Sequence, residues 1–148
     1  MVWGCMAASG VGNLIFIEGI LDKAKYLHIL KDNLKKSAVK LGLLENFYFQ
    51  QDNDPKHKAK IVQEWLLYNI PHMLHTPPQS PDINPIEHLW TEIGKRLQNH
   101  NITSKDQLKE KILQIWNSIE PTVTENLVNS MGRRLSEIIK AKGGTTKY

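Results

Sequence analysis

Seven prolines divide this 148-residue chain into short segments and constrain its fold more than any other feature. Proline fixes φ and lacks a backbone N–H, so it fits the first turn of a helix but interrupts a helix interior. Asp54-Pro55, Asn84-Pro85 and Pro121 therefore predict three helix starts, and Pro71 predicts a helix end. The fold must be assembled from short elements that are joined by stiff turns.

The segments between these breaks alternate between extended and helical patterns. Apolar runs at 2–6 and 14–17, joined by a glycine-rich turn, predict a hairpin, and the aromatic run at 47–51 predicts a third strand. Apolar residues recur at helical spacing over 23–41, after each proline start and after Ser104, where Gln107 completes a capping box. With a short strand at 72–76, the order predicts an α/β fold, a mixed sheet covered by helices. Residues 101–148 form a helical C-terminal extension.

Composition excludes several classes of protein. The 41% hydrophobic and 23% charged residues are ordinary globular usage, and the length fits one domain. No run approaches the roughly 20 apolar residues of a membrane helix, and no basic region precedes the first apolar stretch as it would in a signal peptide. The single cysteine, Cys5, excludes an internal disulfide and a multi-cysteine zinc module.

The charge is mildly basic, with a formal net charge of +4. Residues 101–148 hold eight basic and five acidic side chains, so the excess lies toward the C-terminus. A basic surface is typical of nucleic-acid binding. A solvated lysine-rich surface explains the same numbers, and both interpretations stay open.

Two carboxylates occupy positions suited to chemistry. Asp52 ends the predicted strand at 47–51, and Glu87 lies in the first turn of the helix after Asn84-Pro85, with 34 residues between them. Active sites of α/β folds gather at the carboxyl ends of strands and at nearby helix starts. Carboxylates that converge there can hold Mg²⁺, and two such ions about 3.5–4 Å apart can drive phosphodiester cleavage.

Structural interpretations compete with this one. Glu87 is the third residue after Asn84, where a glutamate commonly caps a helix and meets its dipole favourably. Asp52 fits a turn before an Asp54 cap. His57 and His88 are candidate metal or acid–base groups, although most of the histidines are expected at the surface or in packing. The four tryptophans favour core packing over base stacking.

Two blocks of the sequence resemble the hallmark motifs of the Tc/mariner transposases. They are residues 50–57 (QQDNDPKH) and 77–90 (PPQSPDINPIEHLW). The opening residues 2–5 (VWGC) and the ending 140–144 (KAKGG) resemble the same family, so the resemblance spans essentially the whole chain. The family also places 34 residues between its second and third catalytic acids.

The resemblance implies an RNase H-like fold and a DDE/D endonuclease that uses Mg²⁺ or Mn²⁺ to cut and join DNA. Carried over by position, Asp52 is the second catalytic acid and metal ligand and Glu87 is the third, which overrides the capping interpretation of Glu87. DNA is the expected partner and the nucleus the expected location. The candidate DNA-binding residues are Lys56, His57, Lys58, Lys95, Arg96, Arg133 and Arg134.

The family's first catalytic aspartate lies on the first strand, upstream of the segment that resembles residues 2–5. We therefore expect this chain to lack that central strand, between the hairpin and the strand at 47–51, and the upstream helix-turn-helix region. Two carboxylates without the third cannot build the usual two-metal site.

Three functional hypotheses follow. The first is a fragment of a transposase catalytic domain that is inactive alone. The second is a non-catalytic remnant that binds DNA or pairs with itself or with a full-length transposase. The third is a piece of a longer protein that carries out ordinary DNA cut-and-paste transposition.

Overall fold

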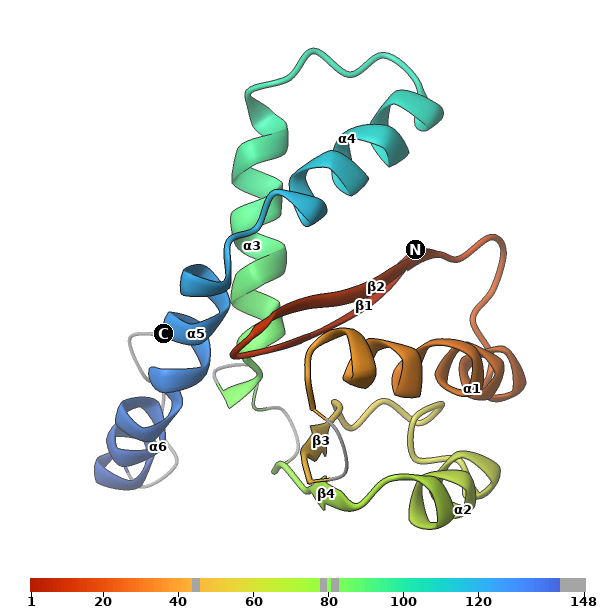
Figure 1. Ribbon diagram of the computed structural model, residues 1–148, viewed down its shortest axis with the longest axis vertical. Coiled ribbons are helices and arrows are strands. Elements are labelled where there is room, and N and C mark those ends of the chain that lie inside the picture. Colours follow the sequence, from red (N-terminus) through yellow and green to blue (C-terminus); the bar gives the residue numbers. More distant parts are fainter. Residues whose placement is uncertain (44–45, 78–79, 81–82, 142–148) are drawn as a thin grey trace. The chain divides into compact units, whose positions relative to one another are not determined.

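The computed structural model describes residues 1–43, 46–77, 80 and 83–141. In these residues the chain forms four strands and six helices (Figure 1). The strands are β1 (Val2–Ala7), β2 (Gly10–Phe16), β3 (Tyr48–Gln50) and β4 (His72–Leu74). The helices are α1 (Lys23–Lys40), α2 (Lys60–Asn69), α3 (Pro85–Gln98), α4 (Lys105–Asn117), α5 (Pro121–Asn129) and α6 (Met131–Lys140).

The elements group into two compact units. Unit 1 comprises Met1–Cys5 and Gly12–Ser80, and unit 2 comprises Met6–Val11 and Pro81–Tyr148, so the tip of the hairpin belongs to the second unit. Within the described residues β1 pairs only with β2, while β3 pairs in parallel with β4. The single mixed sheet that we predicted is therefore two separate pairs of strands.

Helix α1 is the main helix of unit 1, and its two ends are fixed by local chemistry. The Asp22 carboxylate accepts the N–H of Lys25 at 2.8 Å, which caps the first turn. At the other end Gly42 has a φ of +70°, and the N–H of Leu43 donates to the carbonyl of Ala38. This is a Schellman ending, and it stops the helix at Lys40, one residue before the end of the predicted range.

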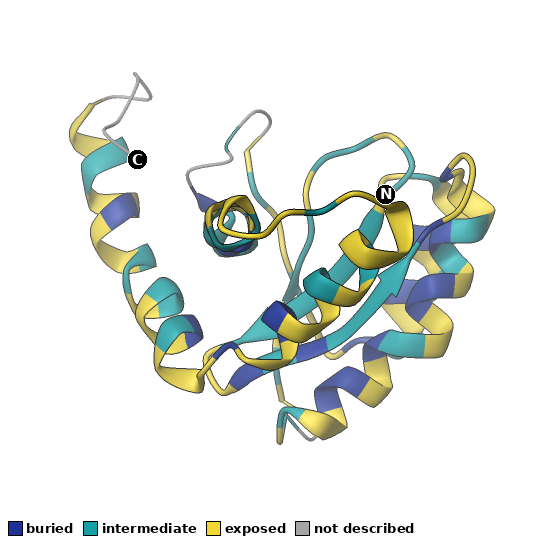
Figure 2. Cartoon of the chain, turned by 90° about the horizontal axis from the view of Figure 1, so that it is seen from above, coloured by how far each residue is buried: buried dark blue, intermediate teal, exposed yellow. Residues whose placement is uncertain are grey.

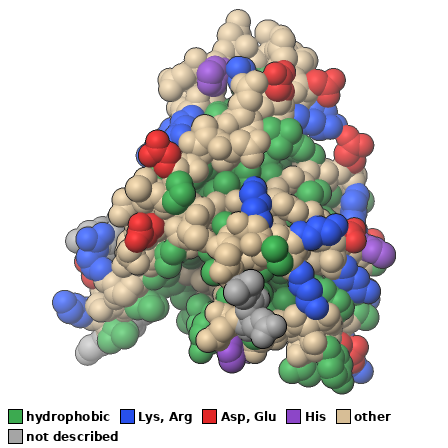
Figure 3. Space-filling view, viewed as in Figure 1, with side chains coloured by type: hydrophobic (Ala, Val, Ile, Leu, Met, Phe, Trp, Pro, Cys, Tyr) green, Lys and Arg blue, Asp and Glu red, His purple; other side chains and the backbone are tan. Residues whose placement is uncertain are grey.

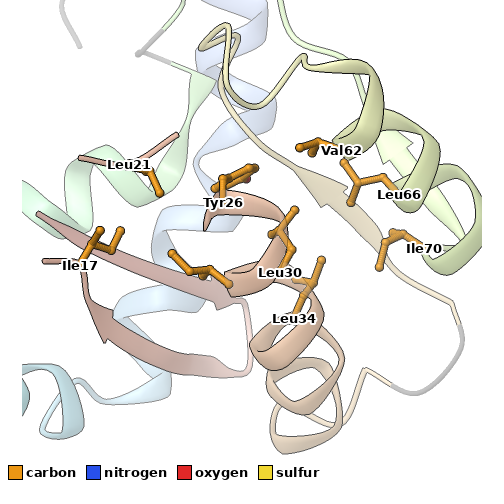
Figure 4. Close-up of a cluster of buried hydrophobic side chains, with 9 residues drawn as sticks. Ile17, Leu21, Tyr26, Leu30, Leu34, Val62, Leu66 and Ile70 are labelled. Atoms are coloured by element: carbon orange, nitrogen blue, oxygen red, sulfur yellow. The ribbon is translucent and has the colours of Figure 1, made fainter. Parts of the chain in front are cut away.

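The core of unit 1 forms where the apolar face of α1 meets α2 and the strands. Figure 2 shows that the helices carry both buried and exposed residues, as amphipathic helices do. Leu30 and Val62 are completely buried, and Trp3 and Trp65 pack against the same cluster. The buried members, most of them labelled in Figure 4, are Ile17, Leu21, Tyr26, Ile29, Leu30, Leu34, Val62, Leu66 and Ile70.

In unit 2, α3 packs against α4 and α5. Trp90 of α3 and Trp116 of α4 stack with ring centroids 5.2 Å apart, and Trp116 is almost fully buried. These contacts confirm core packing for both tryptophans. Thr124 of α5, also fully buried, donates to the carbonyl of Ala8 at 3.1 Å and so joins α5 to the hairpin tip.

Two predicted helix boundaries were wrong. Asp54-Pro55 opens a turn, and α2 begins at Lys60. The carbonyl of His57, which a helix from Pro55 would need, accepts two side-chain amides instead.

The single helix predicted from Pro121 is interrupted at Ser130, which separates α5 from α6. The Ser130 hydroxyl donates to the carbonyl of Leu127 at 2.7 Å, a bond of the kind that competes with the helical ladder. The hairpin turn is also shorter than predicted, because β2 already starts at Gly10. Asp82 and residues 142–144 of the ending motif lie outside the described residues. Within the described residues, no helix combines the length and apolar character needed to cross a bilayer.

Candidate metal centre

Asp52 lies just beyond the carboxyl end of β3, in the loop that follows the parallel β3–β4 pair. Its side chain is 53% exposed. One carboxylate oxygen, Oδ1, accepts the N–H of Asp54 at 3.2 Å and contacts Nδ1 of His57. The loop thus holds one oxygen of a solvent-accessible carboxylate in place.

His57 is fixed from several directions. Its ring stacks on the ring of Tyr26, with centroids 3.9 Å apart and an interplanar angle of 27°. Its carbonyl accepts the side-chain amides of Gln51 at 3.2 Å and Gln63 at 2.7 Å. The Tyr26 hydroxyl in turn donates to Oε1 of Gln51 at 2.8 Å. Burial, together with the nearby charge of Asp52, raises the pKa of Tyr26, so its hydroxyl remains a donor at neutral pH.

Asp54 serves the loop itself. Its carboxylate accepts the N–H of Lys56 at 2.9 Å and forms an ion pair with the Lys56 ammonium at 2.6 Å. The hydrogen bond from Lys56 lowers the pKa of Asp54. Asp54 is therefore engaged in an Asx turn rather than in the helix cap that we predicted.

The neighbouring Asn53 tethers the same loop to the segment after β4. Its side-chain amide donates to the carbonyl of Thr76 at 2.9 Å and to that of Pro77 at 3.0 Å. The motif around Asp52, which follows β3, is consequently bound to the segment that follows β4. This fixes the backbone from which the carboxylate projects.

Glu87 is in the first turn of α3, in unit 2, and is exposed. The helix begins after Asn84 with Pro85 in its first turn, as predicted, although the Asn84 side chain makes no capping hydrogen bond. The next residue, His88, contacts the guanidinium of Arg134 on α6. The catalytic role of Glu87 stays a prediction.

Whether a divalent cation fits depends on the side chains that could act as its ligands. The described residues contain no group of three or more His, Cys, Asp or Glu side chains that could hold a metal ion. They do offer two exposed carboxylates, the oxygen donors that Mg²⁺ prefers. In the described residues all contacts to the Asp52 carboxylate fall on Oδ1, which leaves Oδ2 for an ion. Each unit therefore offers one carboxylate that fits such an ion, Asp52 in unit 1 and Glu87 in unit 2.

The candidate DNA-binding residues differ in their surroundings. Lys58, Lys95 and Arg133 are exposed. Lys56 is paired with Asp54, and Arg96 forms an ion pair with Glu92 at 3.0 Å. On the face drawn in Figure 3, basic and acidic side chains are interspersed.

Arg134 differs from the other candidates because it is only 6% exposed. Its guanidinium donates to Oγ of Ser130 at 2.9 Å and contacts His88. This burial favours a structural role, and a DNA contact by Arg134 stays a prediction.

The residues that hold His57 in place were not predicted from the sequence. The QQDNDPKH block contains Gln51 and His57, but Tyr26 and Gln63 lie on helices far from it in sequence. The sequence does show a tyrosine on the apolar face of α1, but such a position predicts ordinary core packing.

Comparison with known proteins identifies the family of this chain. The family model for DDE superfamily endonucleases matches residues 4–109. The Tc1 transposase of Caenorhabditis elegans is 38% identical over all 148 residues, and the Tcb1 transposase of Caenorhabditis briggsae is 40% identical. The chain covers 54% of each, so it spans about half the length of these relatives.

Solved structures show the fold. The Mos1 transposase catalytic domain, determined with raltegravir and Mn, superposes with a TM-score of 0.88 at 19% identity. The match covers 99% of this chain and 76% of that one. The fold class is therefore confirmed as RNase H-like. The chain belongs to the DDE superfamily of endonucleases, and the relatives that it matches are transposases of the Tc/mariner type.

Proposed function

We propose that this chain is part of a DNA transposase catalytic domain in which Asp52 and Glu87 hold divalent metal ions for DNA strand cleavage and transfer. The observation that carries the proposal is the presentation of Asp52. Its carboxylate is exposed beyond the end of β3, in a loop that Asn53 tethers to the segment after β4, with Oδ2 left for an ion. Structures of the Mos1 catalytic domain were solved with Mn and with Mg, which supports Mg²⁺ or Mn²⁺ as the cofactor.

When bound, two divalent ions activate a water and stabilise the leaving oxygen of a phosphodiester. The chain's own residues contribute by holding the metal ligands in position. Asp52 supplies an oxygen from a rigid loop, and Glu87 supplies one from the first turn of a helix. The place of Glu87 in the first turn of α3 also lets the helix dipole interact favourably with its negative charge.

We further propose that the 148 residues alone do not cut DNA. The described residues lack a third acidic ligand, whereas the family mechanism uses three. The test is a nicking assay on supercoiled plasmid with Mg²⁺ or Mn²⁺, using the chain and its Asp52→Asn variant. We expect both to leave the plasmid at background. Nicking by the unmodified chain that Asp52→Asn abolishes would refute the inactivity claim and establish a complete site.

DNA is the proposed substrate, and the nucleus the proposed site of action. Structures of Mos1 include its strand transfer complex, which supports a DNA-bound role. The exposed residues Lys58, Lys95 and Arg133 are the candidates best placed for phosphate contacts. If they make such contacts, the affinity for DNA falls steeply with salt and each alanine variant reduces the slope. We also propose residues 1–148 as one partial catalytic domain with its helical extension from 101 onward.

A second candidate is a remnant that interferes with an intact transposase. The observation in its favour is the small β3–β4 sheet, in which each strand has a single strand neighbour within the described residues. Such edge strands pair readily with another chain. Co-purification with a full-length Tc1-type transposase is the expected result. Lack of co-purification at micromolar concentrations would exclude this role.

A further inference from the structure

We propose that His57 is a positioning residue that fixes one oxygen of Asp52, Oδ1, so that the other, Oδ2, faces an incoming divalent ion. This inference rests on the proposed function, because it assigns a purpose to contacts around a proposed metal ligand. It can be tested by measurements that do not depend on catalytic activity.

The contacts to the Asp52 carboxylate are asymmetric. Both described contacts to Asp52 fall on the same oxygen, one from the N–H of Asp54 and one from Nδ1 of His57. A carboxylate only accepts hydrogen bonds, so Nδ1 of His57 must carry the proton and donate it. Two donors on Oδ1 stop the carboxylate from rotating, and Oδ2 keeps a fixed direction.

His57 is itself immobilised. Its side chain is only 16% exposed and its ring stacks on Tyr26, which is 2% exposed in the core of unit 1. Two glutamine amides, from Gln51 and Gln63, hold its carbonyl. A donor fixed by α1, α2 and the end of β3 can orient the carboxylate far better than a solvent-exposed side chain could.

Two alternative roles of His57, as a metal ligand and as a phosphate contact, fit these contacts less well. A histidine that ligates the same ion through Nδ1 would have to release Asp52. A histidine that binds DNA phosphate would donate from an accessible ring N–H, yet the side chain of His57 is only 16% exposed. Outer-shell partners that orient a ligand typically contribute 10–100-fold to metal affinity. We therefore expect His57 to act through Asp52.

Three variants separate the hydrogen bond from the stacking. His57→Asn keeps an N–H donor near the position of Nδ1, His57→Gln moves the donor outward, and His57→Phe keeps the ring without a donor. Asp106→Asn is the matched control, because Asp106 is an exposed acid in the first turn of α4. Far-UV circular dichroism verifies that each variant is folded.

The first readout needs no metal. Long-range ¹H–¹⁵N correlation spectra report which ring nitrogen of His57 carries the proton. We expect the Nδ1–H form in the unmodified chain and its loss in Asp52→Ala, which removes the acceptor. An Nε2–H form in the unmodified chain, or an unchanged form in Asp52→Ala, would overturn the proposal.

The second readout is Mn²⁺ affinity, measured by electron paramagnetic resonance of the free ion. We expect His57→Phe and His57→Gln to weaken binding at least about tenfold, His57→Asn to recover most of it, and Asp106→Asn to leave it unchanged. If Asp52→Asn weakens binding but His57→Phe does not, the positioning role fails while the proposed function stands. If Asp52→Asn has no effect, or the unmodified chain binds no Mn²⁺, the proposed metal site fails and the positioning role with it.

Discussion

Gly12 of β2 lies where the hairpin meets α1, and replacing it with alanine is a stringent test of that packing. A Cβ at this position would lie 2.6 Å from Sγ of Cys5, 2.7 Å from Cβ of Ser37 and 2.9 Å from Oγ of Ser37. All three distances are shorter than van der Waals contact allows. Ser37 cannot retreat freely, because its hydroxyl accepts the N–H of Asn13 at 3.0 Å.

The expected cost follows from these contacts. Overpacking a close-packed interior costs about 1–3 kcal/mol, and loss of the Ser37 hydrogen bond adds about 1 kcal/mol. The lower entropy of the unfolded alanine chain returns about 0.4–1 kcal/mol. We therefore expect Gly12→Ala to lower the free energy of unfolding by about 2 kcal/mol.

Urea unfolding measures this difference. With a slope of about 2 kcal/mol per molar urea, the midpoint falls by about 1 M. Gly94→Ala is the matched control: Gly94 lies inside α3, where an added Cβ meets no described atom within 4 Å, so we expect a gain of about 0.5–1 kcal/mol. Adding Cys5→Ala to Gly12→Ala removes the closest clash and yields a favourable coupling energy. An unchanged or raised midpoint for Gly12→Ala would refute the described packing.

Three further predictions concern stability. Thr124→Val removes a buried hydroxyl that lies within hydrogen-bond distance of the carbonyls of Pro121 (2.9 Å) and Ala8 (3.1 Å), so thermal unfolding should show a loss of about 1 kcal/mol. Ser104→Ala removes the acceptor for the N–H of Gln107 and should cost about 1 kcal/mol in the same assay, which Ser104→Asp restores. Burial raises the pKa of the Cys5 thiol, so the native state holds this proton more tightly than the unfolded chain. The resulting stability is complete below about pH 8.5 and is lost as pH rises through the folded pKa; urea midpoints from pH 7 to 9.5 should fall more for the unmodified chain than for Cys5→Ala, and equal slopes would contradict this.

Local chemistry made several elements predictable from the sequence. Ser104 caps α4, Asn84-Pro85 starts α3 and Gly42 ends α1, because each depends on residues within one helical turn. The motif block likewise indicated Asp52 as the candidate ligand, and the structure places it just beyond a strand end as expected.

Features that depend on distant residues were not predictable. The turn at Asp54 forms because the carbonyl of His57 is taken by Gln51 and Gln63, and no local pattern reveals that competition. Arg134 reads as a surface cation in the sequence, but in the fold it lies buried beside His88, 46 residues away.

The central proposal is that Asp52 and Glu87 serve one metal centre. Paramagnetic broadening of backbone amide signals by substoichiometric Mn²⁺ tests it most directly, because broadening falls off steeply with distance from the ion. We predict that amides 51–54 and 86–89 broaden first and together, and that Asp52→Asn and Glu87→Gln each abolish the effect at both segments. Broadening that is confined to one segment, or that begins at other acidic residues and survives both substitutions, would contradict the claim.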